Sequence, residues 1–198
     1  PRVAFFDHRA AAWDQQMGGN TAQVLRRLDA LRDRLGLRPG VNVLEIGCGT
    51  GLITGWLVES VRPGRVVAAD FSPAMLAQAR AKHIDADFRQ MDICSDLPET
   101  DAFDLVWCFQ CFPHFRNHPA ALRNIAHGLK PEGRLVVLHL QGSRQMNEFH
   151  RQVGGAVHAD LLPPADRWPR LLSLGGLQLA GLEDRDDLFL LEARKLAL

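Results

Sequence analysis

Glycines alternate with other residues at positions 47, 49 and 51, and an acid, Glu45, stands two positions before the first of them. The stretch Val41 to Ile46 before this turn is mostly apolar, as in a parallel strand that is buried on both faces. Glycine admits positive φ angles and lets a ligand approach the backbone closely, because it has no Cβ. A helix that begins near Leu52 would aim its free N–H groups at the same turn. The pattern predicts a nucleotide-type site at the carboxyl end of a first strand.

A second acid follows a second apolar run. Val66 to Ala69 predicts another buried strand, and Asp70 ends it 19 positions after Gly51. Rossmann-type units place a ribose-binding acid at this separation. A carboxylate there can accept hydrogen bonds from both hydroxyl groups of the sugar. The alternative is that Asp70 only caps the helix that Pro73 begins.

These motifs resemble those of the class I S-adenosylmethionine-dependent methyltransferases. Leu44-Glu45-Ile46-Gly47-Cys48-Gly49-Thr50-Gly51 is similar to motif I of that family, and the segment from Ala69 to Leu76 to its post-I motif. Asp104-Leu105-Val106 resembles motif II, and Leu129 to Gly133 resembles the L-K-P-G-G turn with Glu132 in place of the first glycine. The resemblance covers almost the whole chain. The rival class is the nucleotide-binding dehydrogenases, whose usual G-x-G-x-x-G spacing differs from the G-x-G-x-G found here.

The resemblance implies a fold of the α/β class: a doubly wound, Rossmann-like methyltransferase fold with a seven-stranded, mostly parallel sheet. The implied strand order is 3-2-1-4-5-7-6, with one antiparallel strand. We expect a single domain over residues 1–198, with an N-terminal helical segment at 1–36 and a substrate-side insertion at 141–165. Two interpretations of the N-terminal stretch stay open. It forms either a lid over cofactor and substrate or an amphipathic helix packed on the sheet edge.

The family pattern implies S-adenosyl-L-methionine as the cofactor. Its contacts would come from the glycine turn and from the ends of the second, third and fourth strands, namely from Glu45, Gly47, Cys48, Gly49, Gly51, Asp70, Phe71, Met75, Asp92, Ile93 and Phe109. In the family, an acid at the position of Asp92 takes the adenine amino group. An aspartate also ends strands for reasons of turn geometry alone, which is the alternative for Asp92.

Histidines gather after the fourth and fifth predicted strands. His114 follows the fourth strand, His139 lies at the end of the fifth, and His150 and His158 lie on the polar segment beyond it. We predict His114, His139 and His150 as catalytic candidates. His114 and His139 would face the methyl donor, with one of them acting as base or substrate anchor, because histidine titrates near neutral pH. The alternative is that both are structural and are held by backbone carbonyls.

Cys108, Cys111 and His114 form a C-x2-C-x2-H pattern that could bind a soft metal. We expect no metal site, because Cys108 falls within a predicted strand and no second ligand pair follows at the spacing of a zinc finger. Small buried thiols are the interpretation that we favour.

Composition limits the class of partner. Lysine plus arginine and aspartate plus glutamate both total 23, so the net charge is zero and nothing favours nucleic acid or a membrane surface. The apolar runs have the length of strands, so we expect no transmembrane helix, and the opening residues do not form a signal peptide. Four cysteines in apolar contexts favour a reducing compartment, and we expect a cytoplasmic protein that is a monomer or homodimer.

The sequence therefore predicts an enzyme that transfers a methyl group from S-adenosylmethionine to a small-molecule nucleophile. Whether that nucleophile is oxygen, nitrogen, sulfur or carbon stays open. The alternative is a non-catalytic protein that binds S-adenosylmethionine or S-adenosylhomocysteine on the same fold.

Overall fold

The computed structural model describes residues 2–17 and 20–196. Within these residues the strands form a seven-stranded sheet in the order β3-β2-β1-β4-β5-β7-β6, and β7 runs antiparallel to both of its neighbours. The predicted strand order and the antiparallel strand are confirmed. The strands are β1 Val43–Ile46, β2 Val66–Asp70, β3 Asp87–Gln90, β4 Phe103–Phe109, β5 Leu129–His139, β6 Leu177–Arg185 and β7 Leu188–Lys195.

The helices between these strands include four short 3-10 turns. They are α1 Arg2–Asp7, η1 Ala10–Ala12, α2 Trp13–Met17, α3 Thr21–Asp29, α4 Arg32–Leu35, α5 Thr54–Val61, α6 Pro73–Ala81, η2 Phe112–His114, α7 His118–Gly128, α8 Ser143–Val153, η3 Gly155–Val157, η4 Ala165–Arg167 and α9 Trp168–Leu174. The chain divides into two compact units, residues 1–91 and 92–198. The expectation of one domain over the whole chain stays a prediction.

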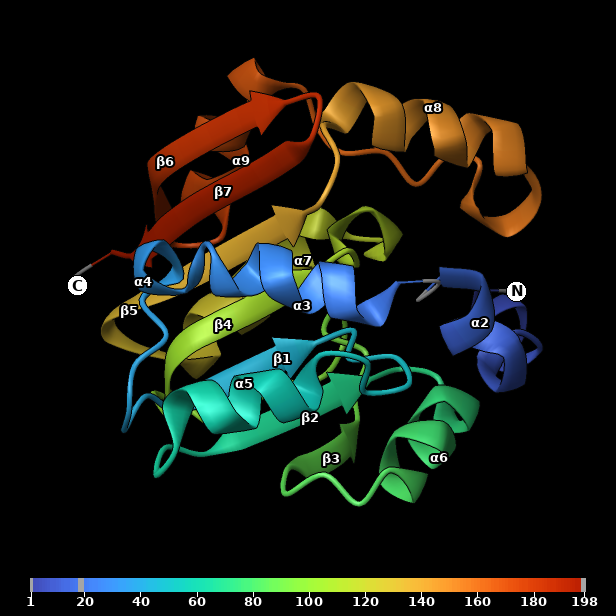
Figure 1. The fold of residues 1–198 in the computed structure, drawn as a ribbon. Coiled ribbons are helices and arrows are strands. Elements are labelled where there is room, and N and C mark those ends of the chain that lie inside the picture. The colour runs from blue at the N-terminus through green and yellow to red at the C-terminus, as the bar shows by residue number, and fades with distance from the viewer. Residues whose placement is uncertain (1, 18–19, 197–198) are drawn as a thin grey trace. The chain divides into compact units, whose positions relative to one another are not determined.

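The first unit is built on β1, β2 and β3, which pair in parallel (Figure 1). Every residue of β1 and β2 is buried, as the unbroken apolar runs predict, whereas β3 has exposed residues at both ends and two half-buried residues between them. Helix α5 contacts β2, and helix α6 contacts β2 and β3. These elements bring the carboxyl ends of β1 and β2 to the same edge of the sheet.

The helical part of the chain between Thr21 and Leu35 is divided into two helices, α3 and α4. Asn20 caps the first part, α3, by accepting a hydrogen bond from the Gln23 backbone N–H at 3.0 Å. A turn at Ala30 and Leu31 separates it from α4. Gly36 ends α4 as a glycine C-cap with a φ of +67°.

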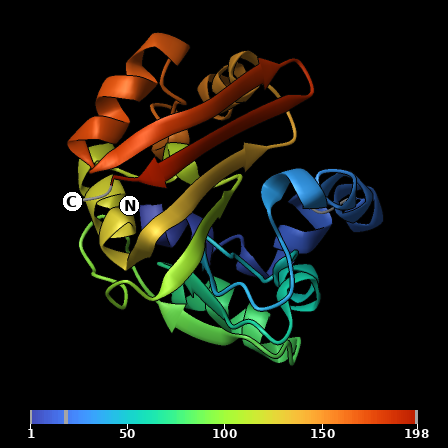
Figure 2. The ribbon, with the colours of Figure 1, turned by 90° about the vertical axis from the view of Figure 1, so that its left-hand side faces the viewer.

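The second unit contains β4 to β7. Figure 2 shows the long β6–β7 hairpin (red) beside β5 (gold). Strand β6 continues through residues 183–185 up to the turn of the hairpin. Trp107 on β4 and Trp168 on α9 are fully buried and anchor the core of this unit.

Helix α8 was not predicted. Its sequence is polar, and in the structure only Met146 and His150 among its residues are buried. A periodic apolar face is the main helix signal in a sequence, and two buried positions in eleven give too little of it. Most of the predicted substrate-side insertion at 141–165 is therefore this helix and the loop behind it.

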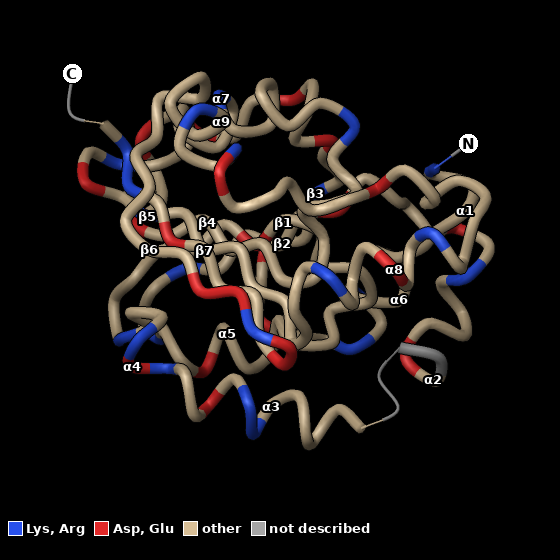
Figure 3. The backbone as a smooth tube through the Cα atoms, turned by 90° about the horizontal axis from the view of Figure 1, so that it is seen from above, with Lys and Arg blue, Asp and Glu red and all other residues tan. Residues whose placement is uncertain are grey.

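Acidic and basic positions are interspersed along the described chain, as Figure 3 shows. The drawing agrees with the equal totals of 23 acidic and 23 basic residues. None of the helices described here has both the length and the apolar character needed to cross a bilayer.

Glu45 places a carboxyl group in the core of the first unit. It lies on β1, is 2% exposed, and accepts a hydrogen bond of 2.7 Å from Thr54 Oγ1 at the start of α5. Burial, together with the nearby charge of Asp70, raises the pKa of Glu45 from 4.5 to about 7, although the Thr54 hydroxyl opposes the shift. The folded unit therefore binds this proton more tightly than the unfolded chain does.

This pKa shift makes the free energy of unfolding depend on pH. Between pH 4.5 and about 7 the native state holds the Glu45 proton while the unfolded state releases it, so Glu45 should lower the free energy of unfolding as pH rises through this range. The full difference is about 3 kcal/mol, at about 1.4 kcal/mol per pKa unit. Glu45→Gln keeps an acceptor for Thr54 and should remove this part of the pH dependence in urea unfolding at pH 5 to 8. Equal slopes for variant and wild type would show that Glu45 does not carry it.

Glu132 adopts a backbone conformation that favours glycine. It begins the bend inside β5 with a φ of +63°, at the position where the family pattern has a glycine. A side chain costs about 1–2 kcal/mol in this region because its Cβ approaches the carbonyl oxygen. Glu132 is exposed in the second unit.

Glu132→Gly should therefore raise the free energy of unfolding by about 0.5–1 kcal/mol, after the extra chain entropy of glycine is subtracted. Chemical unfolding measures the change. The control is Glu132→Ala, which removes the carboxylate but keeps the Cβ and should give no gain. An equal gain in both variants would trace the effect to the carboxylate and not to the backbone.

Candidate functional site

The turn after β1 has the backbone geometry that its glycines allow. Gly49 has a φ of +54° and Gly51 a φ of +75°, both in the left-handed region. A Cβ on Gly51 would lie 3.3 Å from the Cβ of Ala79 on α6, which is tighter than ordinary packing. A Cβ on Gly49 would lie 3.9 Å from Nε1 of Trp13. The turn is therefore closely packed on one side and is covered by the N-terminal segment on another.

Asp70 joins the turn after β1 to the turn after β2. The Gly49 backbone N–H donates to its Oδ2, and the Ser72 backbone N–H donates to its Oδ1, both at 2.8 Å. Asp70 is only 7% exposed, and Ser72, not Asp70, caps α6 by accepting a hydrogen bond from the Met75 N–H. Asp70 is therefore not the helix cap that was its alternative interpretation. A carboxylate oxygen can accept more than one hydrogen bond.

Two other residues that were predicted to contact the cofactor have buried side chains. The Cys48 side chain packs with Ala68 and Leu76 and is 6% exposed, and Met75 is 1% exposed. Burial raises the pKa of the Cys48 thiol, with added repulsion from Glu45 and Asp70. Both side chains are thus part of the core of the first unit.

The N-terminal segment lies on these two turns through two acids. Asp7 Oδ1 accepts hydrogen bonds from Ser72 Oγ at 2.5 Å and from the Ala74 N–H at 3.3 Å, at the start of α6. Asp14 accepts a hydrogen bond from Thr50 Oγ1 in the glycine turn and pairs with Lys82 at 2.6 Å. Asp7 thus binds the start of α6. Neither contact had a signal in the sequence, because the partners are 65 and 36 positions away.

Aromatic rings complete the contact of this segment with the turns. Phe6 is buried, with its ring centroid 5.4 Å from that of Phe71 and 5.7 Å from that of Trp13. Phe71 follows Asp70 directly. The segment therefore covers the turn that the predicted cofactor residues form within the first unit (Figure 1).

In the second unit, Asp92 is engaged by neighbours. Its Oδ2 accepts a hydrogen bond from Arg116 Nη2 at 2.7 Å, and its Oδ1 accepts one from the Cys94 N–H at 3.0 Å. Ile93 is 2% exposed, and Phe109 at the end of β4 is half-buried and stacks with Trp107 at 6.5 Å. The roles proposed for Asp92, Ile93 and Phe109 toward a cofactor stay predictions.

The three histidines predicted as catalytic lie together. The rings of His114 and His150 have centroids 5.0 Å apart, and the charges of both act on His139. His114 is held by Asp160, whose Oδ2 lies 2.9 Å from its Nδ1, while the Nδ1 of His150 contacts the backbone oxygen of Asp160. Parallel pairing of β4 with β5 explains why residues after these two strands meet.

His139 differs from its neighbours. It is 0% exposed, and neither ring nitrogen has a hydrogen-bond partner among the described residues. Burial, and then the charges of His114 and His150, lower its pKa from 6.5 to about 3, so the ring is neutral. Burial also lowers the pKa of His150. The prediction that His139 faces a methyl donor stays a prediction, and in this structure its ring has no exposed surface.

His158 is exposed and bonds to the Arg151 carbonyl, so it stands apart from the cluster. Cys108 is 0% exposed and Cys111 is 7% exposed, which places both thiols in the core. Across residues 2–17 and 20–196, no group of three or more histidine, cysteine or acidic side chains could hold a metal ion.

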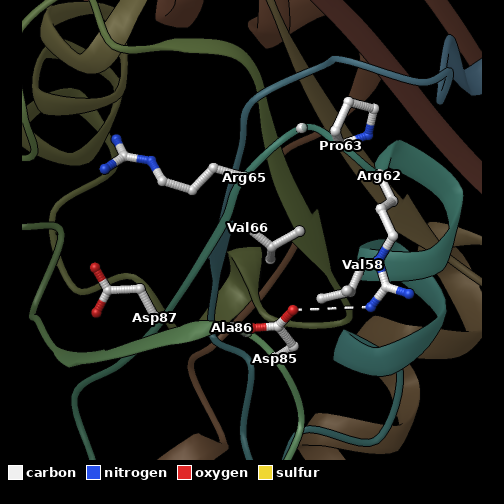
Figure 4. Close-up of a pocket in the computed structure, with 9 residues that line it drawn as sticks. Val58, Arg62, Pro63, Arg65, Val66, Asp85, Ala86 and Asp87 are labelled. Atoms are coloured by element: carbon white, nitrogen blue, oxygen red, sulfur yellow. Dashed lines mark ion pairs between the residues drawn. The ribbon is translucent and has the colours of Figure 1, made fainter.

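A depression of about 410 Å³ lies elsewhere in the first unit, at the amino ends of β2 and β3. Figure 4 shows Arg62 paired with Asp85 at 3.8 Å on its rim. Ligands of open parallel sheets bind outside the carboxyl ends of the strands. This depression is therefore at the wrong end of the sheet for the predicted site.

Comparisons with known proteins match this chain to methyltransferases. The family described as Methyltransferase domain matches residues 43–133. The ubiquinone biosynthesis O-methyltransferase of Xylella fastidiosa is 33% identical over 143 residues, which cover 70% of this chain and 56% of that protein. The malonyl-[acyl-carrier protein] O-methyltransferase of Bacillus cytotoxicus is 29% identical over 148 residues, with 74% and 51% covered. The chain thus spans about half the length of these relatives.

Among solved structures, the DhpI–SAH complex aligns with a TM-score of 0.76 at 22% identity and covers 99% of this chain and 96% of that one. This likeness concerns the fold. With the matched methyltransferase sequences and the confirmed strand order, it establishes that the chain belongs to the class I S-adenosylmethionine-dependent methyltransferases.

Proposed function

We propose that this chain transfers the methyl group of S-adenosylmethionine to a small-molecule nucleophile. The observation that carries the proposal is the pair of 2.8 Å hydrogen bonds by which Asp70 accepts from Gly49 and Ser72. They hold a carboxylate beside a glycine turn whose backbone a ligand can approach. A carboxylate beside such a turn fits an adenosine ribose and its amino-acid moiety.

Different residues of the first unit would have different roles in binding the cofactor. Asp70 accepts hydrogen bonds from the ribose hydroxyls, while Gly47, Gly49 and Gly51 leave room for the rest of the ligand. Glu45 sits beneath the turn and fixes the start of α5 through Thr54. When bound, S-adenosylmethionine supplies an electrophilic methyl group on a sulfonium, so the protein has to orient the acceptor and exclude water.

The acceptor atom proposed is oxygen. Both relatives described above are O-methyltransferases by name, which supports this choice. His114, His139 and His150 supply imidazoles for a substrate proton or hydroxyl.

The four cysteines are free thiols, which supports a reducing compartment such as the cytoplasm.

Labelled methyl transfer tests the proposal directly. S-adenosylmethionine with a labelled methyl group is incubated with the full chain and a panel of hydroxyl, carboxyl and amine metabolites, and products are identified by mass spectrometry. Calorimetry with S-adenosylhomocysteine and with NAD tests the cofactor separately. Binding of NAD but not of S-adenosylhomocysteine would overturn the family-based assignment of the site.

Asp70→Ala should weaken S-adenosylhomocysteine binding by about 2–4 kcal/mol, since charge-assisted hydrogen bonds contribute about 1.5–3 kcal/mol each before water compensates. Titration calorimetry measures the loss. Asp85→Ala is the matched control, because that carboxylate is 90% exposed at the other end of the sheet and should leave the affinity unchanged. An unchanged affinity in Asp70→Ala would remove Asp70 from the site.

Trp13→Ala separates the two interpretations of the N-terminal segment. If the segment closes over a bound cofactor, loss of the ring next to Gly49 should speed S-adenosylhomocysteine dissociation about 10-fold in stopped-flow displacement. Trp56→Ala on α5 is the control for loss of an indole, because its Nε1 bonds to Asp29 on α3. A dissociation rate equal to that of the wild type would identify the segment as a packing element only.

A further inference from the structure

Asp160 is a buried acid at the centre of the histidine cluster. Its side chain retains 1% of its exposed area, while that of His114 retains 15%. Its backbone N–H bonds to the carbonyl of Val157, which fixes it behind helix α8. Asp160 therefore meets two imidazoles with two different groups, its carboxylate toward His114 and its backbone carbonyl toward His150.

Both contacts favour an imidazole proton on Nδ1. A backbone carbonyl can only accept a hydrogen bond, so the Nδ1 of His150 must carry the proton that it donates. In its ionised form the Asp160 carboxylate also only accepts, and the Nδ1 of His114 then donates to it across 2.9 Å. When each ring is neutral, its lone pair is then on Nε2. Asp160 thus orients two imidazoles with the same tautomer, 5.0 Å apart between centroids.

The charge of the cluster narrows the kind of molecule that fits it. Burial lowers the pKa of His139 to about 3 and also lowers the pKa of His150, which disfavours the positive charge that would attract a carboxylate. The Asp160 carboxylate is almost wholly covered, so it offers no accessible negative charge to an ammonium group. A neutral hydroxyl that donates to an imidazole nitrogen suits these surroundings best.

We propose that Asp160 is a positioning residue that holds His114 with Nε2 as proton acceptor, and that the methyl acceptor is a neutral hydroxyl whose proton His114 removes. The inference rests on the methyl-transfer function proposed above. The acceptor oxygen forms the new bond to carbon and gives its proton to Nε2, while the methyl–sulfur bond breaks and leaves its electron pair on sulfur. A carboxylate acceptor needs no such base, because it is ionised at neutral pH.

The first test needs neither cofactor nor substrate. Long-range ¹H–¹⁵N spectra of the full chain at pH 8 should show His114 as the Nδ1–H tautomer. In Asp160→Asn the side-chain amide can donate to Nδ1, and the proton should move to Nε2. Asp166→Asn, an exposed acid on η4, is the matched control and should leave His114 unchanged. An Nε2–H tautomer of His114 in the wild type would overturn the positioning role even if Asp160→Asn failed to fold.

The second test uses labelled S-adenosylmethionine with two phenols. Loss of a general base costs about 10²–10⁴-fold, so Asp160→Asn should slow methylation of phenol at least about 100-fold. It should slow that of 4-nitrophenol much less, since this acceptor is largely ionised near neutral pH. S-adenosylhomocysteine affinity should not change, whereas absent binding by the wild type would instead reject the methyl-transfer proposal. Equal slowing of both phenols, or methylation of benzoate but of neither phenol, would overturn the inference.

Discussion

The hydrogen bonds that Asp70 accepts are the constraint on which the rest of the first unit depends. A carboxylate that is 7% exposed would cost several kcal/mol of solvation if left alone, and the backbone N–H groups of Gly49 and Ser72 offset that cost. The same bonds fix the turn after β1 against the turn after β2. Because the glycine turn is held from outside, its left-handed backbone does not need to be stabilised by a side chain of its own. The proposed ribose contact and the local stability of the two turns therefore depend on the same carboxylate.

Carboxylates also attach the N-terminal segment to these two turns. Asp7 satisfies donors at the start of α6, where N–H groups lack partners within the helix, and Asp14 binds the hydroxyl of Thr50 in the glycine turn. Phe6 and Trp13 add apolar contact beside these polar ones. An ion pair between the segment and the C-terminal end of α6 joins Asp14 to Lys82, whose side chains are 41% and 33% exposed, and an exposed pair contributes about 0–1 kcal/mol.

In the second unit, burial is the main cause that lowers the pKa of His139 and His150. His139 has a pKa of about 3 because it is desolvated, and the pKa of His150 is lowered for the same first reason. Neutral imidazoles are proton acceptors, and the groups that meet their Nδ1 atoms decide which nitrogen accepts. Asp160 fills that role twice, through its carboxylate and its main chain. One residue of an irregular loop therefore organises two rings from two different elements.

The sequence by itself determined the glycine turn and Asp70 at the end of β2, because apolar runs and glycine spacing are local signals. The strand order and the antiparallel β7 followed from the resemblance to the methyltransferase family. The sequence also placed His114 and His139 after adjacent strands, which parallel pairing then brings together. Tertiary structure alone decided what surrounds them. The burial of His139, the contacts of Asp7 and Asp14, helix α8 and the position of Asp160 all depend on residues distant in the chain. Desolvation and hydrogen-bond partners are set by the packed fold, so no spacing in the sequence encodes them.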